Sequence, residues 1–214
     1  MHIYEPQEDS FLFEKLITQL DLTNKKLLDV GCGSGILSTA AKKQGAKVTA
    51  LDINLNAVKQ TQKKGIHAVQ SDLFDNITDT FDVIICNSPY LPAQKGEPFD
   101  PALVGGKKGY EWCVQFLEQA KNYLKTNGCI YLLFSSLSKP DVIIRRATRY
   151  YTQTKITSTN LFFEQLFIYR FTFHQAYKDI IILPLQNINY LNRGRHGILY
   201  TATYNNTTIT LKTK

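Results

Sequence analysis

The sequence predicts an α/β fold in which helices cover both faces of a mostly parallel sheet. Apolar runs of strand length alternate with amphipathic runs of helix length over most of residues 10–151, as in chains built from strand–helix–strand units. Two β-rich runs, 154–159 and 165–173, then follow each other with no helical run between them. Such a pair predicts a closing hairpin whose last strand is antiparallel to the rest of the sheet.

Short apolar runs with the length of buried strands recur between residues 26 and 134. Most of them end at or just before a Gly, Asp or Asn residue, as strands of ligand-binding parallel sheets commonly do. Together with the hairpin they make a Rossmann-like, doubly wound sheet of seven strands. The predicted strands before the hairpin are residues 26–30, 47–52, 66–70, 81–86 and 129–134.

Amphipathic stretches separate these runs, and their apolar residues have the spacing of helices that cover a sheet. The first begins at Ser10, a residue type that caps helix N-termini. The second ends before Gly45, which favours the conformation that follows a helix. The predicted helices are residues 10–20, 36–44, 56–64, 109–124 and 140–151.

The composition excludes several classes of protein. Hydrophobic residues make up 43% of the 214-residue chain and charged residues 20%, which is typical of a globular protein and not of a disordered one. No apolar run approaches the roughly 20 residues of a membrane span, and the acidic, polar N-terminus is unlike a signal peptide. We therefore expect a cytoplasmic protein without a membrane segment.

The cysteine pattern does not indicate a metal site, and we expect none. No two cysteines have the C-x-x-C spacing of a structural zinc site. Each lies within an apolar or glycine-rich segment, as expected of buried free thiols in a reducing cytosol. The four cysteines are Cys32, Cys86, Cys113 and Cys129.

Positive charge is concentrated at the C-terminal end of the chain. The whole chain carries a formal charge of +7, which divides into −1 over residues 1–138 and +8 over residues 139–214. A basic C-terminal half can bind nucleic acid or an acidic protein. The alternative is an ordinary solvated basic surface.

The polar loops of the predicted sheet share one edge. The segments 31–35, 52–54, 72–74 and 87–92 each follow a predicted strand. Because the carboxyl ends of parallel strands meet at one edge, and ligands bind there, these loops predict a single site. Their convergence favours a functional site more strongly than any one loop does.

The glycine loop favours a nucleoside ligand that carries no phosphate. Gly31, Gly33 and Gly35 follow the first strand and allow the backbone to approach a ligand closely. Their spacing is not the Gly-x-Gly-x-x-Gly of pyrophosphate binders, whereas S-adenosylmethionine is a nucleoside without phosphate. Asp52 ends the next strand, where it can accept both ribose hydroxyls, and Asp72 follows the third strand, within reach of an adenine amine. A plain tight turn is the alternative.

The segment Asn87-Ser88-Pro89-Tyr90 predicts a site for a planar NH2 group. Pro89 fixes its own φ and holds Ser88 extended, so the Asn87 side-chain oxygen and a backbone carbonyl can each accept one N–H. Tyr90 offers a flat face for stacking. The amine can belong to a carboxamide or to a nucleobase, and an ordinary Asn-x-Pro turn is the alternative.

Together these motifs resemble the class I S-adenosylmethionine-dependent methyltransferases. More narrowly, the chain is similar to the HemK-type glutamine N5-methyltransferases, which modify the Gly-Gly-Gln motif of translation release factors. Its Glu-Pro-x-Glu-Asp-Ser opening is similar to the archaeal and eukaryotic branch, which lacks the N-terminal helical domain of the bacterial branch. The resemblance runs through residues 4–10, 28–35, 52–54, 71–74, 87–91, 102–109 and 163–167.

The resemblance implies S-adenosylmethionine as cofactor, a release factor as substrate, and a small zinc-binding activator protein as the partner in a heterodimer. It assigns catalysis to Asn87, Pro89 and Tyr90, and substrate binding to these residues with Ser88 and Leu91. One departure is Ser88, where the family usually has proline; we expect it to loosen the loop. The implied cofactor-binding residues are Ser10, Asp29, Gly31, Cys32, Gly33, Gly35, Asp52, Asp72, Leu73 and Asn87.

The chain divides by this resemblance into a methyltransferase domain at residues 1–174 and a β-rich C-terminal extension at residues 175–214. Within the extension, residues 191–200 and 209–212 resemble the opening strands of a protein kinase, although Asn192 replaces the first glycine. No catalytic loop follows, so kinase activity of this chain alone is excluded. A fusion or split-gene remnant, a docked hairpin and a chance similarity all remain open.

Three functions remain open at this stage. The preferred one is methylation of a protein glutamine, which the Gly-Gly-x-x-Gly segment at 105–109 and the opening motif favour. The second is methylation of an N6-adenine or other nucleobase amine, which the basic C-terminal half favours. The third is a non-catalytic module that binds S-adenosylmethionine and a partner.

Overall fold

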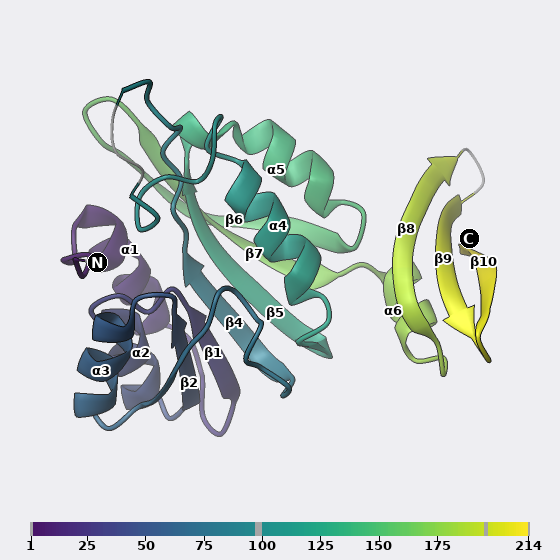
Figure 1. The fold of residues 1–214 in the computed structure, drawn as a ribbon, viewed down its shortest axis with the longest axis horizontal. Coiled ribbons are helices and arrows are strands. Elements are labelled where there is room, and N and C mark those ends of the chain that lie inside the picture. Colours follow the sequence, from purple (N-terminus) through teal and green to yellow (C-terminus); the bar gives the residue numbers. More distant parts are fainter. Residues whose placement is uncertain (1, 97–99, 195–196, 214) are drawn as a thin grey trace.

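The computed structural model describes residues 2–96, 100–194 and 197–213, and a seven-stranded sheet forms its centre (Figure 1). Every pairing in this sheet is parallel except those of the seventh strand, which is antiparallel to both its neighbours. The predicted α/β class and the antiparallel last strand are therefore confirmed. In spatial order the strands are β3 (His67–Gln70), β2 (Lys47–Asp52), β1 (Lys26–Val30), β4 (Phe81–Asn87), β5 (Leu124–Ser135), β7 (Gln165–Phe173) and β6 (Tyr151–Asn160).

Helices pack on both faces of the sheet because neighbouring residues of each central strand alternate between two apolar cores. Leu27 of β1 and its partner Val83 of β4 face one core, whereas Leu28 and Ile84 face the other. This alternation makes the sheet doubly wound. The first face carries α1 (Glu8–Ile17), α2 (Ile36–Lys43) and α3 (Leu55–Lys63), and the second carries α4 (Glu111–Ala120) and α5 (Pro140–Ala147).

Three predicted helices end earlier than expected. Helix α1 ends at Ile17 and begins at Glu8 with Gln7 as its N-cap, so Ser10 lies inside the helix and the predicted cap is wrong. Helix α4 stops at Ala120 and the chain enters β5 at Leu124, which pairs with Phe81 across an irregular register. Helix α5 stops at Ala147, and Tyr151 already begins β6. Tyr151 is 2% exposed, stacks on Phe173, and donates its hydroxyl to the Leu117 carbonyl. Buried aromatic packing therefore outweighs the helical pattern that sequence periodicity indicated at the end of residues 140–151.

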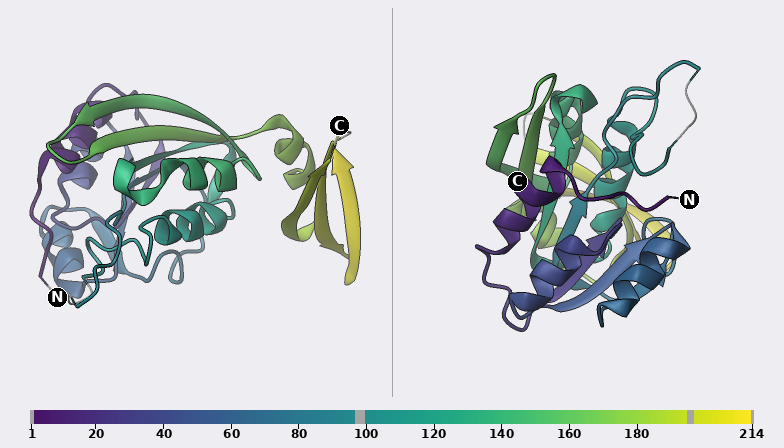
Figure 2. Two further views of the ribbon diagram at one scale, coloured as in Figure 1. Left: turned by 90° about the horizontal axis from the view of Figure 1, so that it is seen from above. Right: turned by 90° about the vertical axis from the view of Figure 1, so that its left-hand side faces the viewer.

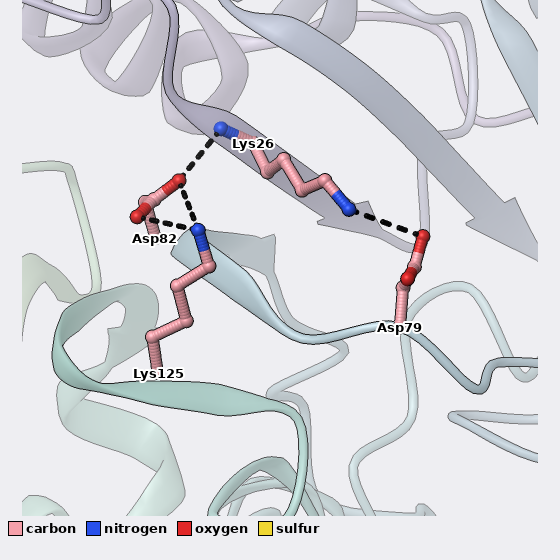
Figure 3. Close-up of polar contacts among 4 residues, drawn as sticks. All are labelled: Lys26, Asp79, Asp82 and Lys125. Carbon is pink, nitrogen blue, oxygen red and sulfur yellow. Dashed lines mark hydrogen bonds and ion pairs between the residues drawn. The ribbon is translucent and has the colours of Figure 1, made fainter.

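Ion pairs join the amino ends of three central strands (Figure 3). Asp82 of β4 accepts a hydrogen bond from the Lys26 amide of β1 at 2.9 Å and pairs with Lys125 Nζ of β5 at 2.9 and 3.0 Å. Lys26 Nζ also lies 3.6 Å from Asp79. These groups are partly exposed, so each pair contributes at most about 1 kcal/mol. They mark the edge of the sheet opposite the predicted site.

The C-terminal extension forms a separate three-stranded antiparallel sheet, of order β10 (Thr207–Thr213), β9 (Gly197–Tyr204) and β8 (Gln186–Gly194), preceded by α6 (Gln175–Ile181). This confirms its predicted β-rich character, while α6 was not predicted. Residues 195–196 of the kinase-like segment lie outside the described residues. The extension lies at the end of the molecule opposite the N-terminus (Figures 1 and 2).

The extension packs on the main sheet through aromatic residues. Tyr200 is fully buried, and its hydroxyl donates to the Arg149 carbonyl at 2.8 Å. The Tyr150 hydroxyl accepts from the Tyr190 amide at 3.2 Å. The apolar core shared by the two parts includes Tyr150, Tyr151, Phe171, Phe173, Tyr177, Ile180, Ile198 and Tyr200.

Two further predictions concern cysteines and membranes. All four cysteines are buried and free, as predicted. In the part of the chain that the structure describes, no helix is long and apolar enough to cross a membrane.

Candidate active site

A cavity of about 380 Å³ opens at the carboxyl edge of the sheet, a size typical of small-molecule sites. The N-terminal segment and the loops after β1, β2, β3 and β4 form its wall. The structure thus brings together most of the predicted site residues, whose individual roles stay predictions. Those that line the cavity are Ser10, Gly31, Cys32, Gly33, Asp52, Asp72, Leu73, Asn87, Ser88, Pro89, Tyr90 and Leu91.

The glycine loop bends sharply between β1 and α2. The amides of Gly31 and Cys32 both donate to the Leu51 carbonyl, at 2.9 and 2.8 Å, which fixes the loop on β2. Gly35 has a φ of 80° and does not line the cavity. A Cβ at this position would lie 2.6 Å from Thr61 Oγ1, so glycine is needed here for close packing against α3. Because Gly35 does not line the cavity, the structure does not support its predicted contact with the cofactor.

Asp52 is tied to the glycine loop through its carboxylate. Its Oδ2 accepts from the Gly33 amide and its Oδ1 from the Asn54 amide, both at 2.8 Å. Burial raises the pKa of Asp52, and these two hydrogen bonds oppose the rise. Each oxygen keeps a second lone pair, so the carboxylate can accept both hydroxyls of a ribose.

Asp29 supports the site from beneath and does not line the cavity. It is fully buried, and its Oδ2 accepts from Ser38 Oγ of α2 at 2.6 Å. Its Oδ1 has no hydrogen-bond partner among the described residues. Burial raises the pKa of Asp29 to about 7, the Ser38 bond opposes this, and the charge of Asp52 adds to it. Direct contact between Asp29 and the cofactor therefore stays a prediction that this geometry does not favour.

The loop after β3 supplies the predicted residues Asp72 and Leu73, and Ser71 also lines the cavity. Asp72 is exposed and lines the cavity. Leu73 is 7% exposed and holds a left-handed φ of 45°, which is uncommon for a residue with a side chain. Asp72 can therefore accept from an exocyclic amine while Leu73 forms an apolar wall.

Asn87 carries an oriented and unpaired acceptor. Its Nδ2 donates to Asp9 Oδ2 at 3.0 Å and reaches Ser10 Oγ at 3.4 Å. An ionised carboxylate only accepts, so the Asn87 NH2 group must face Asp9 and the Oδ1 atom must point away from it. This Oδ1 is buried and has no hydrogen-bond partner among the described residues.

Asp9 and Tyr4 were missed by sequence reasoning. Asp9 is 4% exposed, and its carboxylate accepts from the Ser10 amide at 2.6 Å and from the Tyr4 hydroxyl at 3.1 and 3.2 Å. Burial, followed by the charge of Asp9, raises the pKa of Tyr4, so Tyr4 stays a neutral donor. The sequence feature that could have indicated Asp9 is its position directly before Ser10, a predicted site residue. No local pattern in the sequence, however, pairs Asp9 with Asn87.

Ser88 is held in place by its hydroxyl. It is 3% exposed, its Oγ donates to the Leu133 carbonyl of β5 at 2.6 Å, and Cys113 Sγ lies 3.2 Å away. The Ser88 amide also reaches Leu133 O at 3.4 Å. These contacts restrain the loop, so the loosening expected from the missing proline ring is offset.

The Gly-Gly-x-x-Gly segment lies directly against the Asn-Ser-Pro-Tyr loop. The Leu91 amide donates to Leu103 O and the Gly105 amide to Leu91 O, both at 2.9 Å. A Cβ on Gly105 would lie 2.5 Å from Pro89 O, and one on Gly109 2.6 Å from Tyr90 O. Glycine is therefore required because two backbones meet without room for a side chain.

Negative charge surrounds the Tyr90 side of the cavity. Tyr90 is half-buried, and burial raises its pKa, as do the charges of Asp9, Glu164 and Glu8. The phenol is therefore neutral and presents a flat face. Further lining residues that the sequence did not reveal include His2, Ile3, Trp112 and Gln115, while Asn54 and Leu103 line the cavity from the predicted segments 52–54 and 102–109.

A sheet of this strand order, with a nucleoside-sized cavity at the carboxyl edge of β1 and β4, defines the class of the Rossmann-like methyltransferases. The methyltransferase small domain model matches residues 9–162, which include the six strands from β1 to β6. The chain therefore belongs to the methyltransferase small domain family.

Several relatives carry names that specify a reaction. The chain is 42% identical over 147 residues to a Methanocaldococcus jannaschii protein assigned as a protein N5-glutamine methyltransferase, covering 64% of this chain and 74% of that one. It is 32% identical over 143 residues to a release factor glutamine methyltransferase of Lactococcus lactis, covering 58% of this chain and 53% of that one. The chain thus spans about half the length of the bacterial relative.

A solved structure extends the likeness to the fold. A chain of the E. cuniculi Mtq2–Trm112 complex, which is responsible for methylation of the eRF1 translation termination factor, superposes on this chain with a TM-score of 0.70 at 26% identity. The match covers 81% of this chain and all of that one.

Proposed function

We propose that this chain transfers the methyl group of S-adenosylmethionine to the side-chain amide nitrogen of glutamine, in the Gly-Gly-Gln motif of a translation release factor. The family membership and the names of the relatives support the reaction class and the substrate. The observation that carries the proposal is the unpaired Oδ1 of Asn87, oriented by Asp9 at the cavity. A buried acceptor without a donor costs about 1–3 kcal/mol, which an incoming N–H removes.

The residues present fit the cofactor. The cavity has the volume of a small-molecule site, and Asp52 has lone pairs left for ribose hydroxyls. Asp72 and Leu73 would receive the adenine, and the loop at Gly31 and Gly33 would lie against the amino acid part. When bound, S-adenosylmethionine supplies an electrophilic methyl group on a cationic sulfur, which is a good leaving group.

The work left to the protein is to position a weak nucleophile. An amide nitrogen is weak because its lone pair is delocalised into its carbonyl. Asn87 Oδ1 and the Ser88 carbonyl would each accept one of its N–H groups and stabilise the positive charge that develops on nitrogen. Pro89 and Tyr90 would pack against the flat amide. No general base is required to hold the nitrogen in this way. The N–CH3 bond would form as the S–CH3 bond breaks, the neutral thioether would leave, and the methylated nitrogen, which is then cationic and strongly acidic, would release one of its two protons to water.

Asp9 strengthens the Asn87 acceptor. A carboxylate that takes the Asn87 N–H at 3.0 Å polarises the amide and increases the negative charge on Oδ1, because hydrogen bonds in a chain reinforce one another. Asp9 is therefore a positioning residue. It acts through Asn87 and has no contact of its own with the acceptor in this scheme.

Nucleobase methylation is the second candidate, because an exocyclic amine meets the same two acceptors. The basic residues 139–214 favour it by composition, but the extension, to which five of their eleven Lys and Arg residues belong, lies at the far end of the molecule (Figure 2). The carboxylates of Glu8, Asp9 and Glu164 around Tyr90 repel a phosphate backbone. A non-catalytic module is disfavoured by the oriented Asn87 amide, which cofactor binding alone does not need.

The free edge of the sheet is a surface on which a small protein partner could bind. Strand β3 ends the sheet order, so one of its edges has no strand neighbour among the described residues. Ile53 and Leu55 are 45% and 44% exposed directly beyond β2. We propose that a small zinc-binding activator covers this side in a 1:1 complex, as the Mtq2–Trm112 neighbour suggests, and that the complex acts in the cytoplasm.

One experiment tests the function. The chain, with and without the activator, is incubated with radiolabelled S-adenosylmethionine, a release factor and total RNA. Label on the release factor, lost when its Gly-Gly-Gln glutamine is replaced by asparagine, supports the proposal. Label on RNA alone establishes the nucleobase reaction instead, and no label on either with the complex overturns both.

A further inference from the structure

We infer that Phe162 and Phe163, at the turn between β6 and β7, dock the polypeptide that carries the acceptor glutamine. We call this pair the aromatic tip. The inference rests on the proposed function and adds to it the surface that binds the substrate protein outside the cavity.

The aromatic tip is exposed without an internal structural reason. Phe162 is 100% exposed and Phe163 is 93% exposed, with ring centroids 6.3 Å apart. Single exposed apolar residues are common, but two adjacent phenyl rings that are almost wholly in water lose the burial free energy of both. Such pairs mark interaction sites, where aromatic residues contribute most of the binding energy.

The aromatic tip is held rigidly although its rings are free. The Leu161 amide donates to Glu164 O at 2.8 Å, which closes the turn. The Glu164 carboxylate accepts from the Ser135 hydroxyl, and the Gln165 amide donates to Ser136 Oγ at 3.0 Å. The turn is thus tied to the carboxyl end of β5, so little conformational entropy is lost when the rings bind a partner.

The aromatic tip adjoins the acceptor side of the cavity. Leu161 and Tyr90 pack against the same apolar core, and Glu164 acts electrostatically on both Tyr90 and Tyr4. The turn and the N-terminal segment lie at the same end of the long axis of the molecule in Figure 1 and in the left view of Figure 2. A protein whose glutamine enters beside Tyr90 therefore meets the aromatic tip next.

The negative charges near Tyr90 favour a polypeptide as the partner that binds the aromatic tip. Glu8, Asp9 and Glu164 each act electrostatically on Tyr90, and Glu164 directly follows the aromatic tip in the chain. This combination of acidic groups and exposed rings fits a segment with an apolar side chain and flanking Lys or Arg residues. It disfavours an RNA backbone and an anionic membrane, both of which carry negative charge.

The test compares a tip variant with a matched control. The variant F162S/F163S removes both rings, and the control I182S/L183S removes two exposed apolar side chains from the extension, where Ile182 is 71% and Leu183 44% exposed. Initial rates of release factor methylation give KM and kcat for each protein, and calorimetry gives its affinity for S-adenosylmethionine. We expect the tip variant to raise KM at least about tenfold, with kcat and cofactor affinity within about twofold of wild type and with the control unchanged.

Other results overturn the inference. An unchanged KM in the tip variant, or an equal rise in the control, removes the aromatic tip from substrate binding while the proposed function stands. Co-flotation with phosphatidylcholine–phosphatidylglycerol vesicles that is lost in the tip variant assigns the rings to a membrane. If the wild-type complex methylates RNA and not the release factor, the proposed function fails and this inference fails with it.

Discussion

Asp9 and Asn87 are 78 residues apart in the chain and are joined by a hydrogen bond of 3.0 Å between Asn87 Nδ2 and Asp9 Oδ2. The bond links the start of α1 to the end of β4. Because Asp9 can only accept, it determines which atom of the Asn87 amide faces the cavity. The opening motif of the chain therefore contributes to the geometry of the cavity, although it lies outside the sheet.

The first prediction is that Asp9 controls rate more than cofactor binding. Asp9→Ala removes a hydrogen bond to a charged group, worth about 1.5–3 kcal/mol, and frees the Asn87 amide to rotate. We expect kcat to fall about 10- to 100-fold, while the Kd of S-adenosylmethionine changes less than threefold. Asp9→Asn keeps an oxygen for Asn87 Nδ2 and should recover part of the rate. A kcat within twofold of wild type in Asp9→Ala would show that Asn87 orients itself.

The second prediction concerns Asn87 and pH. Asn87→Ala should lower kcat by roughly 10²–10³, the typical loss for a preorganised transition-state contact. Asn87→Asp places a second carboxyl beside Asp9, and two carboxylates at this distance raise one of their pKa values. At low pH the new carboxyl is protonated, so it donates to Asp9 and keeps a free carbonyl, as the amide does.

The kcat of Asn87→Asp, relative to wild type, should therefore fall as pH rises from 5.5 to 8.5. Asn87→Ala is the control, because it has no titrating group and its relative kcat should not vary. If Asn87→Ala methylates at the wild-type rate, the Asn-Ser-Pro-Tyr segment is an ordinary turn and the acceptor assignment is wrong.

The third prediction is that Asp52 contributes to cofactor affinity. Asp52→Ala removes two acceptors for ribose hydroxyls and also releases the Gly33 amide. S-adenosylmethionine binding should weaken by about 1.5–3 kcal/mol, the range for hydrogen bonds to a charged group. Calorimetry measures it, and Glu5→Ala, an exposed N-terminal carboxylate, serves as the charge control. Equal affinity in Asp52→Ala and wild type would remove Asp52 from the site.

The fourth prediction is that the extension contributes to the stability of the main domain. Tyr200 is fully buried in a core shared with Phe171 and Phe173, so Tyr200→Ala should lower the free energy of unfolding by about 3–5 kcal/mol. Tyr200→Phe loses only the hydroxyl bond to Arg149 O and should cost about 1 kcal/mol. Denaturant unfolding should show one transition. Two separate transitions would make residue 174 a boundary between independent domains.

The sequence was sufficient for the sheet and for one side of the site. Strand–helix alternation predicted the class, and the rule that parallel strands share a carboxyl edge predicted that Gly33, Asp52 and Asn87 meet. These features are local, because each strand and the loop after it are encoded by a few adjacent residues. The end of α4 was predicted too late because Leu124 already pairs with Phe81 in β5, and the end of α5 because Tyr151 is buried at the start of β6.

The rest of the site depends on contacts between distant segments. No local pattern pairs Asp9 with Asn87, or sets the Gly105 backbone against Pro89 O. The sequence also could not show that Ser88 restrains its loop, because its hydroxyl bonds to the Leu133 carbonyl of another strand. Such contacts follow only from the assembled fold.

The last prediction concerns Asp29, whose buried carboxyl makes stability depend on pH. Burial raises its pKa from the ordinary 3.8 to about 7, so between these values the folded state binds a proton that the unfolded state has released. The free energy of unfolding must then fall as pH rises through this range. A pKa difference of this size between the folded and unfolded states corresponds to roughly 4 kcal/mol in the free energy of unfolding.

Asp29→Asn isolates this contribution because the amide cannot ionise and still accepts from Ser38. Between pH 4 and 7 the stability of wild type relative to Asp29→Asn should decline, and above about pH 7 the difference should become constant, since both states of wild type are then ionised. Urea unfolding at pH 4, 5.5, 7 and 8.5 measures both proteins, and the other titrating groups cancel in the comparison. A stability difference that does not vary over this range would show that Asp29 is ionised in the fold, and that the charge of Asp29 is balanced by a partner other than Ser38.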